Sequence, residues 1–194
     1  MRDKSEHMPI TEQPLPYVGC LDARPLSQID LVVMHCTELP DMAMAREYGE
    51  RVLYPSGTGH SGHFYIDRDG SIIRYVPIDR IANHTRGFNP RSIGIEIVNI
   101  GRYPHWLDSQ HQAMNEPYTA EQQRAVIDLL SYLKSELPNL TFIAGHEDLD
   151  TEKVTASDNP NALVYRKRDP GPHFHWPEVL AACGLSRLFL EPHV

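Results

Sequence analysis

The chain has 194 residues, of which 41% are hydrophobic, and it carries a formal net charge of −8 at pH 7. This length is typical of one globular domain with a sizeable core, because domains commonly contain about 100–200 residues. The acidic balance and the lack of a Lys/Arg-rich stripe exclude a nonspecific grip on nucleic acid and argue against binding to an acidic membrane surface.

The first 24 residues are expected to form an N-terminal extension, followed by a catalytic domain over residues 25–190. Residues 1–17 contain breakers and scattered charges, and no apolar run that could serve as the core of a signal peptide. No segment of the sequence is apolar enough to cross a membrane. We therefore expect a cytoplasmic protein, or a periplasmic or secreted one if a leader has been removed.

Hydrophobic runs and turn signals predict the elements of the first half of the chain. A short apolar run from Leu31 predicts a buried strand with His35 at its carboxyl end. The pair Asp69-Gly70 is a strong turn signal between two hydrophobic segments, which predicts a hairpin. The expected elements are a strand at 31–35, a helix at 42–53, a hairpin at 61–76 and a strand at 93–98.

The second half begins with a clear helix signal. Thr119 can cap a first turn, Gln122 can return the bond, and Pro138 ends the helix. A strand at 140–144 and a terminal helix at 176–183 follow, while the polar stretches 101–117 and 150–164 are expected to be loops at the rim of a site. Because strands and helices alternate without repeats, we expect an α/β (α+β) fold, a single domain with a central mixed β-sheet flanked by helices.

The three cysteines are widely spaced and form neither a CxxC motif nor an obvious disulfide framework. Inert thiols are the favoured interpretation, and a bridge between Cys20 and Cys183 stays open for an exported protein. Cys36 directly follows His35 on a strand, so its side chain should point to the opposite face.

Four separated segments carry side chains that could together supply every part of a zinc hydrolase. They are VVMHCT at 32–37, SIGIEI at 92–97, IAGHED at 143–148 and RKRDPGP at 166–172. In this order, from about residue 31 to 176, the chain resembles the zinc-dependent N-acetylmuramoyl-L-alanine amidases of type 2, which are relatives of the peptidoglycan recognition proteins. The combination is far more specific than any one segment.

The resemblance implies that His35, His146 and Asp169 bind one Zn²⁺ ion and leave its fourth position open. Each of these histidines follows a hydrophobic strand, a context that the others among the eleven histidines lack. Two alternatives stay open. His173 and His175 could share one face if extended, although the Pro-Gly-Pro before them indicates a loop entering a helix, and Asp169 could be a turn former before its Pro-Gly pair.

Glu96 interrupts an apolar strand, where a buried carboxylate is costly unless it is paired or functional, although it could instead lie at a solvated edge. The resemblance implies that Glu96 is the general base. Lys167 lies two positions before Asp169, so an extended backbone would direct both side chains to one site, where the ammonium could stabilise an oxyanion. Some relatives use a tyrosine near the start of the hairpin. Gly62 stands there in this chain, which puts more weight on Glu96.

The resulting hypothesis is hydrolysis of the amide bond between the N-acetylmuramoyl lactyl group and L-alanine of peptidoglycan or muropeptides. A catalytically silent peptidoglycan-binding module and a zinc hydrolase of an unrelated amide are the alternatives. A soluble muropeptide is the reasonable substrate, with intact sacculi as a further option, and we expect a monomer. His84, Asn89 and Arg91 lie near the strand that carries Glu96 and are candidate substrate contacts, with loop hydrogen bonding as the alternative role.

Overall fold

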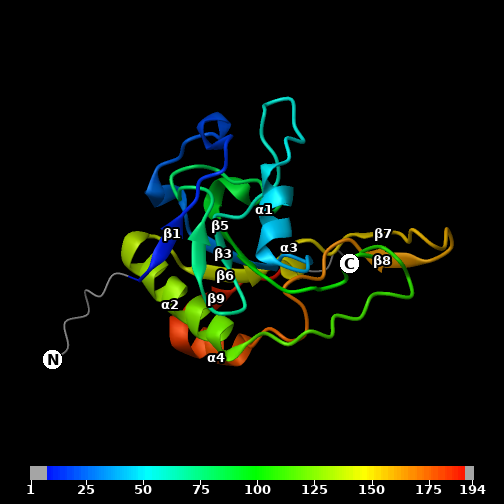
Figure 1. Cartoon of the computed structure of the whole chain (residues 1–194). Helices are drawn as coiled ribbons and strands as arrows, with labels where there is room; N and C mark the ends of the chain where they lie inside the picture. The colour runs from blue at the N-terminus through cyan, green and yellow to red at the C-terminus, as the bar shows by residue number, and fades with distance from the viewer. Residues whose placement is uncertain (1–7, 191–194) are drawn as a thin grey trace.

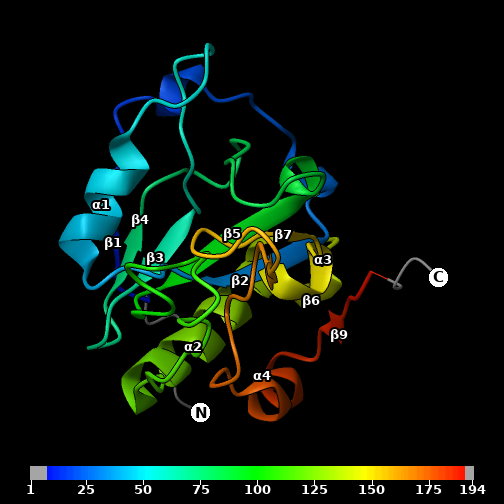
Figure 2. The same cartoon turned by 90° about the vertical axis from the view of Figure 1, so that its right-hand side faces the viewer.

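The computed structural model describes residues 8–190, in which helices pack against a central mixed β-sheet (Figures 1 and 2). Within this part of the chain the sheet has seven strands in the order β1-β4-β3-β5-β2-β6-β9. Its neighbouring strands run parallel, except for the antiparallel pair β3 and β4. The strands are β1 (Ile10–Glu12), β2 (Leu31–Cys36), β3 (Phe64–Ile66), β4 (Ile72–Arg74), β5 (Ser92–Ile97), β6 (Phe142–Gly145) and β9 (Ser186–Arg187). This confirms the expected α/β fold.

Helix α2 (Ala120–Glu136) is capped by Thr119, as its sequence predicts. The hydroxyl of Thr119 accepts a hydrogen bond from the amide of Gln122 at 3.0 Å, and the Gln122 side chain accepts one from the amide of Thr119 at 3.1 Å. This capping box satisfies donors that the first helical turn would otherwise leave unpaired. The helices are α1 (Met42–Glu50), α2 (Ala120–Glu136), α3 (His146–Leu149) and α4 (Trp176–Cys183), with short 3₁₀ turns at Val18–Cys20, Leu26–Gln28 and Asn89–Arg91.

Strand β2 divides its side chains between the two faces of the sheet. It is buried along its whole length between β5 and β6. Val32, Met34 and Cys36 pack into the main hydrophobic core together with α2. Since side chains alternate along a strand, His35 points to the other face, and Cys36 points away from it as expected.

Two expected elements have different limits. Helix α1 ends at Glu50, because Arg51 is extended (ψ 124°) and the amides of Leu53 and Tyr54 both donate to the carbonyl of Thr58. The prediction that residues 150–164 form only a loop is wrong, since β7 (Lys153–Thr155) and β8 (Leu163–Tyr165) pair as an antiparallel ribbon. This ribbon projects from the body of the protein (Figure 1).

Part of the expected N-terminal extension joins the sheet, because β1 pairs with β4 in parallel. Residues 1–7 and 191–194 lie outside the described part of the chain. Cys20 is exposed, Cys36 and Cys183 are buried, and all three are free, so the Cys20–Cys183 bridge does not form.

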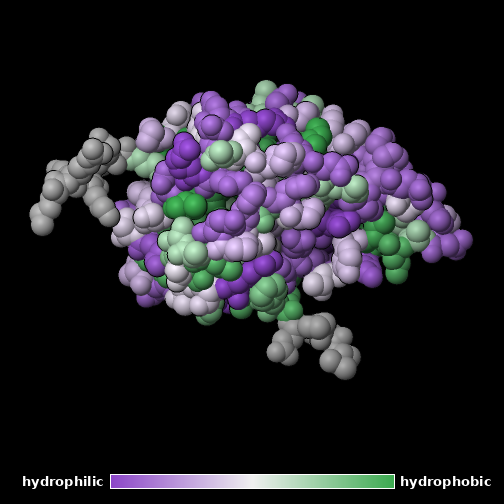
Figure 3. Space-filling view, turned by 90° about the horizontal axis from the view of Figure 1, so that it is seen from below, coloured by the Kyte–Doolittle hydropathy of each residue, from purple (hydrophilic) through white to green (hydrophobic). Residues whose placement is uncertain are grey.

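The surface below α2 and α4 is mostly hydrophilic, with hydrophobic residues in small separate patches (Figure 3). No helix within residues 8–190 is long and apolar enough to cross a lipid bilayer.

Candidate metal centre and active-site cleft

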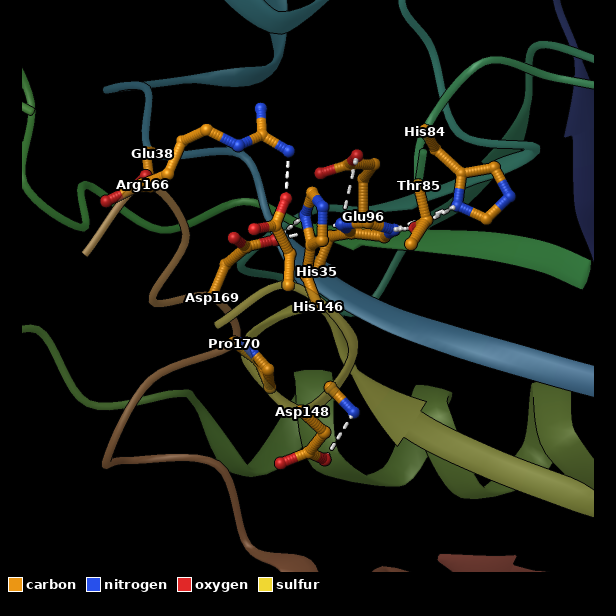
Figure 4. Close-up of polar contacts among 12 residues, drawn as sticks. His35, Glu38, His84, Thr85, Glu96, His146, Asp148, Arg166, Asp169 and Pro170 are labelled. Carbon is orange, nitrogen blue, oxygen red and sulfur yellow. Dashed lines mark hydrogen bonds and ion pairs between the residues drawn. The ribbon is translucent and has the colours of Figure 1, made fainter. Parts of the chain in front are cut away.

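Three side chains from separate segments converge on the face of the sheet opposite α2. Nδ1 of His35 lies 2.8 Å from Oδ2 of Asp169, and Nδ1 of His146 lies 3.2 Å from the same oxygen. The three side chains point toward one another (Figure 4). Their ligand atoms lie within 4.8 Å of one another, and all three residues are buried. The fold therefore brings together the three residues that were expected to bind the metal.

The sheet explains why the two histidines meet. Strands β2 and β6 are parallel neighbours in which Met34 is paired with Gly145, so the residues that follow them, His35 in β2 and His146 at the start of α3, lie side by side at the same end of the sheet. A Cβ atom on Gly145 would lie 2.8 Å from Cδ of Pro170, so this glycine lets the segment with Asp169 approach closely.

Asp169 and α3 are also joined through the backbone. The amide of Glu147 donates to the carbonyl of Asp169 at 3.0 Å. The amide of Gly145 donates to the carboxylate of Asp148 at 2.8 Å, and this carboxylate forms an ion pair with Arg187. These contacts orient the short helix that begins with His146.

Glu96 lies beside the three-residue cluster, on β5. It is the register partner of His35, and its Oε1 lies 4.0 Å from Nδ1 of that histidine. A Cβ atom on Gly62 would lie 2.8 Å from Cγ of Glu96, so the glycine at this position leaves room for the carboxylate. Burial raises the pKa of Glu96 well above its usual value, and Asp169 adds to the increase while Lys167 opposes it.

The charges of the cluster suit a divalent cation. Burial lowers the pKa of His35 to about 4, although its hydrogen bond to Asp169 acts in the opposite direction, so the imidazole is neutral at pH 7. Nε2 of His146 is buried and has no hydrogen-bond partner within residues 8–190. Two imidazoles and one carboxylate form a donor set that zinc prefers, so the residues present fit this metal.

His84 lines the cleft and also contacts His35, so its role as a substrate contact stays a prediction. Its Nδ1 lies 3.0 Å from Nε2 of His35, and its Nε2 lies 3.1 Å from the hydroxyl of Ser92. A Cβ atom on Gly94 would lie 2.7 Å from Cγ of His84, so Gly94 provides the space for the ring. A histidine ligand is commonly oriented by a partner on its second ring nitrogen.

Asn89 and Arg91 make structural contacts in the described fold. The side-chain oxygen of Asn89 accepts hydrogen bonds from the amides of His84 and Thr85 at 3.0 and 2.7 Å, which shapes the loop at the cleft wall. Arg91 forms a two-pronged ion pair with Asp30 and does not line the cleft. The ion pair favours the loop-bonding role for Arg91, whereas Asn89 also lines the cleft, so its contact with substrate stays a prediction.

The metal cluster and Glu96 lie in a cleft with a volume of about 780 Å³. Lys167 lines the same cleft. Other lining residues had no sequence signal that distinguished them, since they come from irregular loops; these include Glu38, Tyr54, Arg102 and Trp106.

The alternative histidine pair is not part of the cluster. His175 immediately precedes α4, where it lies 4.0 Å from the carboxylate of Glu178, and His173 is exposed. The Pro-Gly-Pro segment thus leads into a helix rather than into an extended metal-binding strand.

Comparison with known proteins adds a family to this geometry. The sequence matches the model of the family Amidase_2, described as N-acetylmuramoyl-L-alanine amidase, over residues 25–172. It is 32% identical over 134 residues to the 1,6-anhydro-N-acetylmuramyl-L-alanine amidase AmpD of Salmonella typhimurium, covering 65% of this chain and 58% of that protein. The chain therefore spans less than two thirds of the length of this curated relative.

Solved structures share the fold. The N-acetylmuramoyl-L-alanine amidase LysC from Clostridium intestinale superposes with a TM-score of 0.63 at 21% identity, covering 93% of this chain and 100% of LysC. The amidase AmiD from E. coli, solved with the substrate anhydro-N-acetylmuramic acid-L-Ala-D-gamma-Glu-L-Lys, superposes with a TM-score of 0.59 at 23% identity, covering 84% of this chain and 60% of AmiD.

Proposed function

Because the chain belongs to the N-acetylmuramoyl-L-alanine amidase family, we propose that it hydrolyses the amide bond between the lactyl group of N-acetylmuramic acid and L-alanine. We assign this activity to residues 25–190. The observation that carries the proposal is the convergence of His35, His146 and Asp169 next to the carboxylate of Glu96 in one cleft.

We assign zinc to His35, His146 and Asp169. When bound, Zn²⁺ supplies a Lewis acid that polarises the scissile carbonyl and lowers the pKa of a coordinated water. The protein contributes a buried, pre-arranged set of ligands, in which Asp169 contacts both histidines and His84 supports His35.

We assign the role of general base to Glu96. Its carboxylate lies beside the ligand cluster, with Oε1 4.0 Å from Nδ1 of His35. It takes a proton from the attacking water and transfers a proton to the nitrogen of L-alanine as the amide bond breaks. The oxygen of the water becomes part of the lactyl carboxylate, and the stem peptide leaves with a free amino group.

Lys167 is assigned to the developing negative charge on the carbonyl oxygen. Its side chain lines the cleft with Glu96 and Asp169. Because the site is largely buried, a fixed positive charge there stabilises an oxyanion more strongly than it would in water.

A soluble muropeptide is the substrate that we propose. The cleft lies between the loop after α1 and the segments that carry Arg102 and Lys167, and it is large enough for a sugar linked to a short peptide. The relative AmpD is named for a 1,6-anhydro substrate, and the AmiD structure contains a muramoyl peptide.

The proposal is tested with purified protein reconstituted with zinc. The protein is incubated with a defined anhydromuropeptide and, separately, with intact sacculi, and the products are identified by mass spectrometry. We expect the free stem peptide and the sugar without alanine from the soluble substrate, and no product after chelation. Cleavage inside the peptide, or none with zinc fully bound, would exclude this function.

A further inference from the structure

The segment that carries Lys167 belongs to no helix or sheet. It follows β8 and precedes Asp169, and it therefore lacks the ladder of backbone hydrogen bonds that holds His35 and Glu96 on their strands. A catalytic side chain needs a fixed position, because small misplacements are costly to the rate. The role of the contacts that fix this segment rests on the proposed function.

Arg102 donates hydrogen bonds to the backbone directly before Lys167. One terminal nitrogen of its guanidinium donates to the carbonyl of Tyr165 at 2.9 Å, and the other donates to the carbonyl of Arg166 at 3.4 Å. The Arg102 side chain is buried, with 1% of its surface exposed. These two carbonyls belong to the residues that immediately precede Lys167, so the hydrogen bonds from Arg102 hold the start of the segment.

Glu38 holds the guanidinium from the other side. Nε of Arg102 donates to Oε1 of Glu38 at 2.8 Å, and Nη2 donates to Oε2 at 3.0 Å. The same carboxylate accepts a bond from the backbone amide of Arg102 at 3.1 Å. With a further bond from Nη1 to Gln112 at 3.1 Å, Arg102 makes five side-chain contacts, equal to the number of its N–H donors. The guanidinium therefore has no donor in reserve for a substrate.

The chain adopts an unfavourable backbone to form this pair. Glu38 has a φ of 50°, a left-handed conformation that costs free energy for a residue with a Cβ atom. Gly101 is also left-handed, at φ 52°, and a Cβ atom there would lie 2.5 Å from Cγ of Glu38. The indole of Trp106 donates to the carbonyl of Glu38 at 3.0 Å. Two special backbone positions and one aromatic side chain thus place a single carboxylate.

The following residues of the segment are held as well. Arg166 forms an ion pair with Asp150, and Arg168 donates to the carbonyl of Gln112 at 2.9 Å. Gln112 belongs to the same irregular loop as Arg102 and receives one of its bonds. The loop at 101–117 therefore contacts the segment on both sides of Lys167.

We propose that the buried Glu38–Arg102 pair is a positioning device that holds Lys167 at the reacting carbonyl. Since Glu38 neutralises Arg102 and all donors of the guanidinium are used within the protein, the pair acts through the segment and not by contacting substrate. Loss of the hydrogen bonds from Arg102 should misplace Lys167 and so lower kcat. It should leave zinc binding by His35 and His146 unchanged.

The test is a double-mutant cycle between Arg102→Lys and Lys167→Ala, measured as kcat and KM on a defined muropeptide with zinc-saturated protein. Lysine keeps the charge beside Glu38 but cannot reach both carbonyls. We expect Arg102→Lys to lower kcat on the order of 10–100-fold, as small misplacements do, with a smaller change in KM. In the Lys167→Ala background the same substitution should cause little further loss.

Arg68→Lys is the matched control. Arg68 also pairs with a glutamate, with Nε 2.7 Å from Glu116, and donates to a backbone carbonyl at 2.8 Å, that of Pro40, but it does not line the cleft. This variant should keep the kcat of the wild type. Equal losses from Arg102→Lys in both backgrounds would overturn the proposal, as would full activity of Lys167→Ala.

Hydrogen exchange provides a readout that does not require activity. In Arg102→Lys the peptide that covers residues 163–168 should exchange faster than in the wild type, whereas Arg68→Lys should leave it unchanged. If Arg102→Lys does not fold, Glu38→Gln replaces it, because glutamine preserves the shape and one acceptor oxygen. If exchange at residues 163–168 is unchanged in a folded variant, Arg102 does not hold this segment. A wild type that releases no peptide would instead refute the proposed function.

Discussion

His35 and Glu96 are register partners on adjacent parallel strands, and Oε1 of the glutamate lies 4.0 Å from Nδ1 of the histidine. The sheet thus places one metal-ligand candidate and one base candidate side by side, with no loop between them. Because both are on buried strands, their separation is set by the strand spacing. In the proposed mechanism His35 binds the metal, and Glu96 transfers protons.

Replacement of Glu96 by glutamine should therefore retain the fold and one zinc per chain but lose turnover. Glutamine has the same shape but cannot accept the proton from water. General acid–base assistance is commonly worth about 10²–10⁴-fold, so kcat should fall by that order. Steady-state kinetics together with metal analysis checks this, and near wild-type kcat at full zinc occupancy would rule out Glu96 as the base.

The same substitution should change the pH dependence of stability in the metal-free protein. Burial, reinforced by Asp169, raises the pKa of Glu96 well above its unfolded value. The folded state then binds more protons than the unfolded state at pH values between the two pKa values, so the carboxylate reduces stability as pH rises through that range. Glu96→Gln removes this penalty. Its melting temperature should exceed that of the wild type more at pH 8 than at pH 5, in thermal unfolding of chelator-treated samples. An equal difference at both pH values would contradict a buried, proton-retaining Glu96.

The metal assignment is tested by removing one ligand. Asp169→Ala should lower zinc occupancy, because it deletes the oxygen that both histidines face. Cys36→Ser is the matched control, since the sulfur belongs to the core on the opposite face of the sheet. Elemental analysis and anomalous scattering measure the outcome. Zinc at His173 and His175, or full occupancy in Asp169→Ala, would refute the assignment.

Gly94→Ala tests the packing that supports His35. The added Cβ atom would lie 2.7 Å from Cγ of His84, so the ring or the strand must shift. Such overpacking typically costs about 1–3 kcal/mol of unfolding free energy. Gly19→Ala is the control, because a Cβ atom there meets no atom within 4 Å. Urea denaturation should separate the two variants, and equal stability would show that the loop with His84 yields without cost.

Local signals in the sequence predicted the central sheet and the capped helix, whereas the three-residue cluster was predicted mainly from the resemblance to the type 2 amidases. His35 and His146 follow apolar runs, and Glu96 interrupts one. These signals depend on strand alternation and on strand ends, which the sheet then brings together.

Other parts of the site depend on contacts that no local pattern encodes. Glu38 and Arg102 are 64 positions apart, and their pairing requires a left-handed glutamate and a facing glycine. The ribbon of β7 and β8 has strands of only three residues, too short for a clear period. The position of Arg91 next to β5 in the sequence did not determine where its side chain points, because its guanidinium forms an ion pair with Asp30.

The most direct measurement is the fate of water oxygen during turnover. Zinc-reconstituted wild type is incubated with a defined muropeptide in ¹⁸O-water, and both products are analysed by mass spectrometry, with Glu96→Gln as the inactive control. Hydrolysis at the lactyl amide predicts a sugar product that lacks alanine and carries the label in its lactyl carboxylate, together with an unlabelled stem peptide. A sugar product that retains alanine, or label in the released peptide, would contradict the proposed reaction.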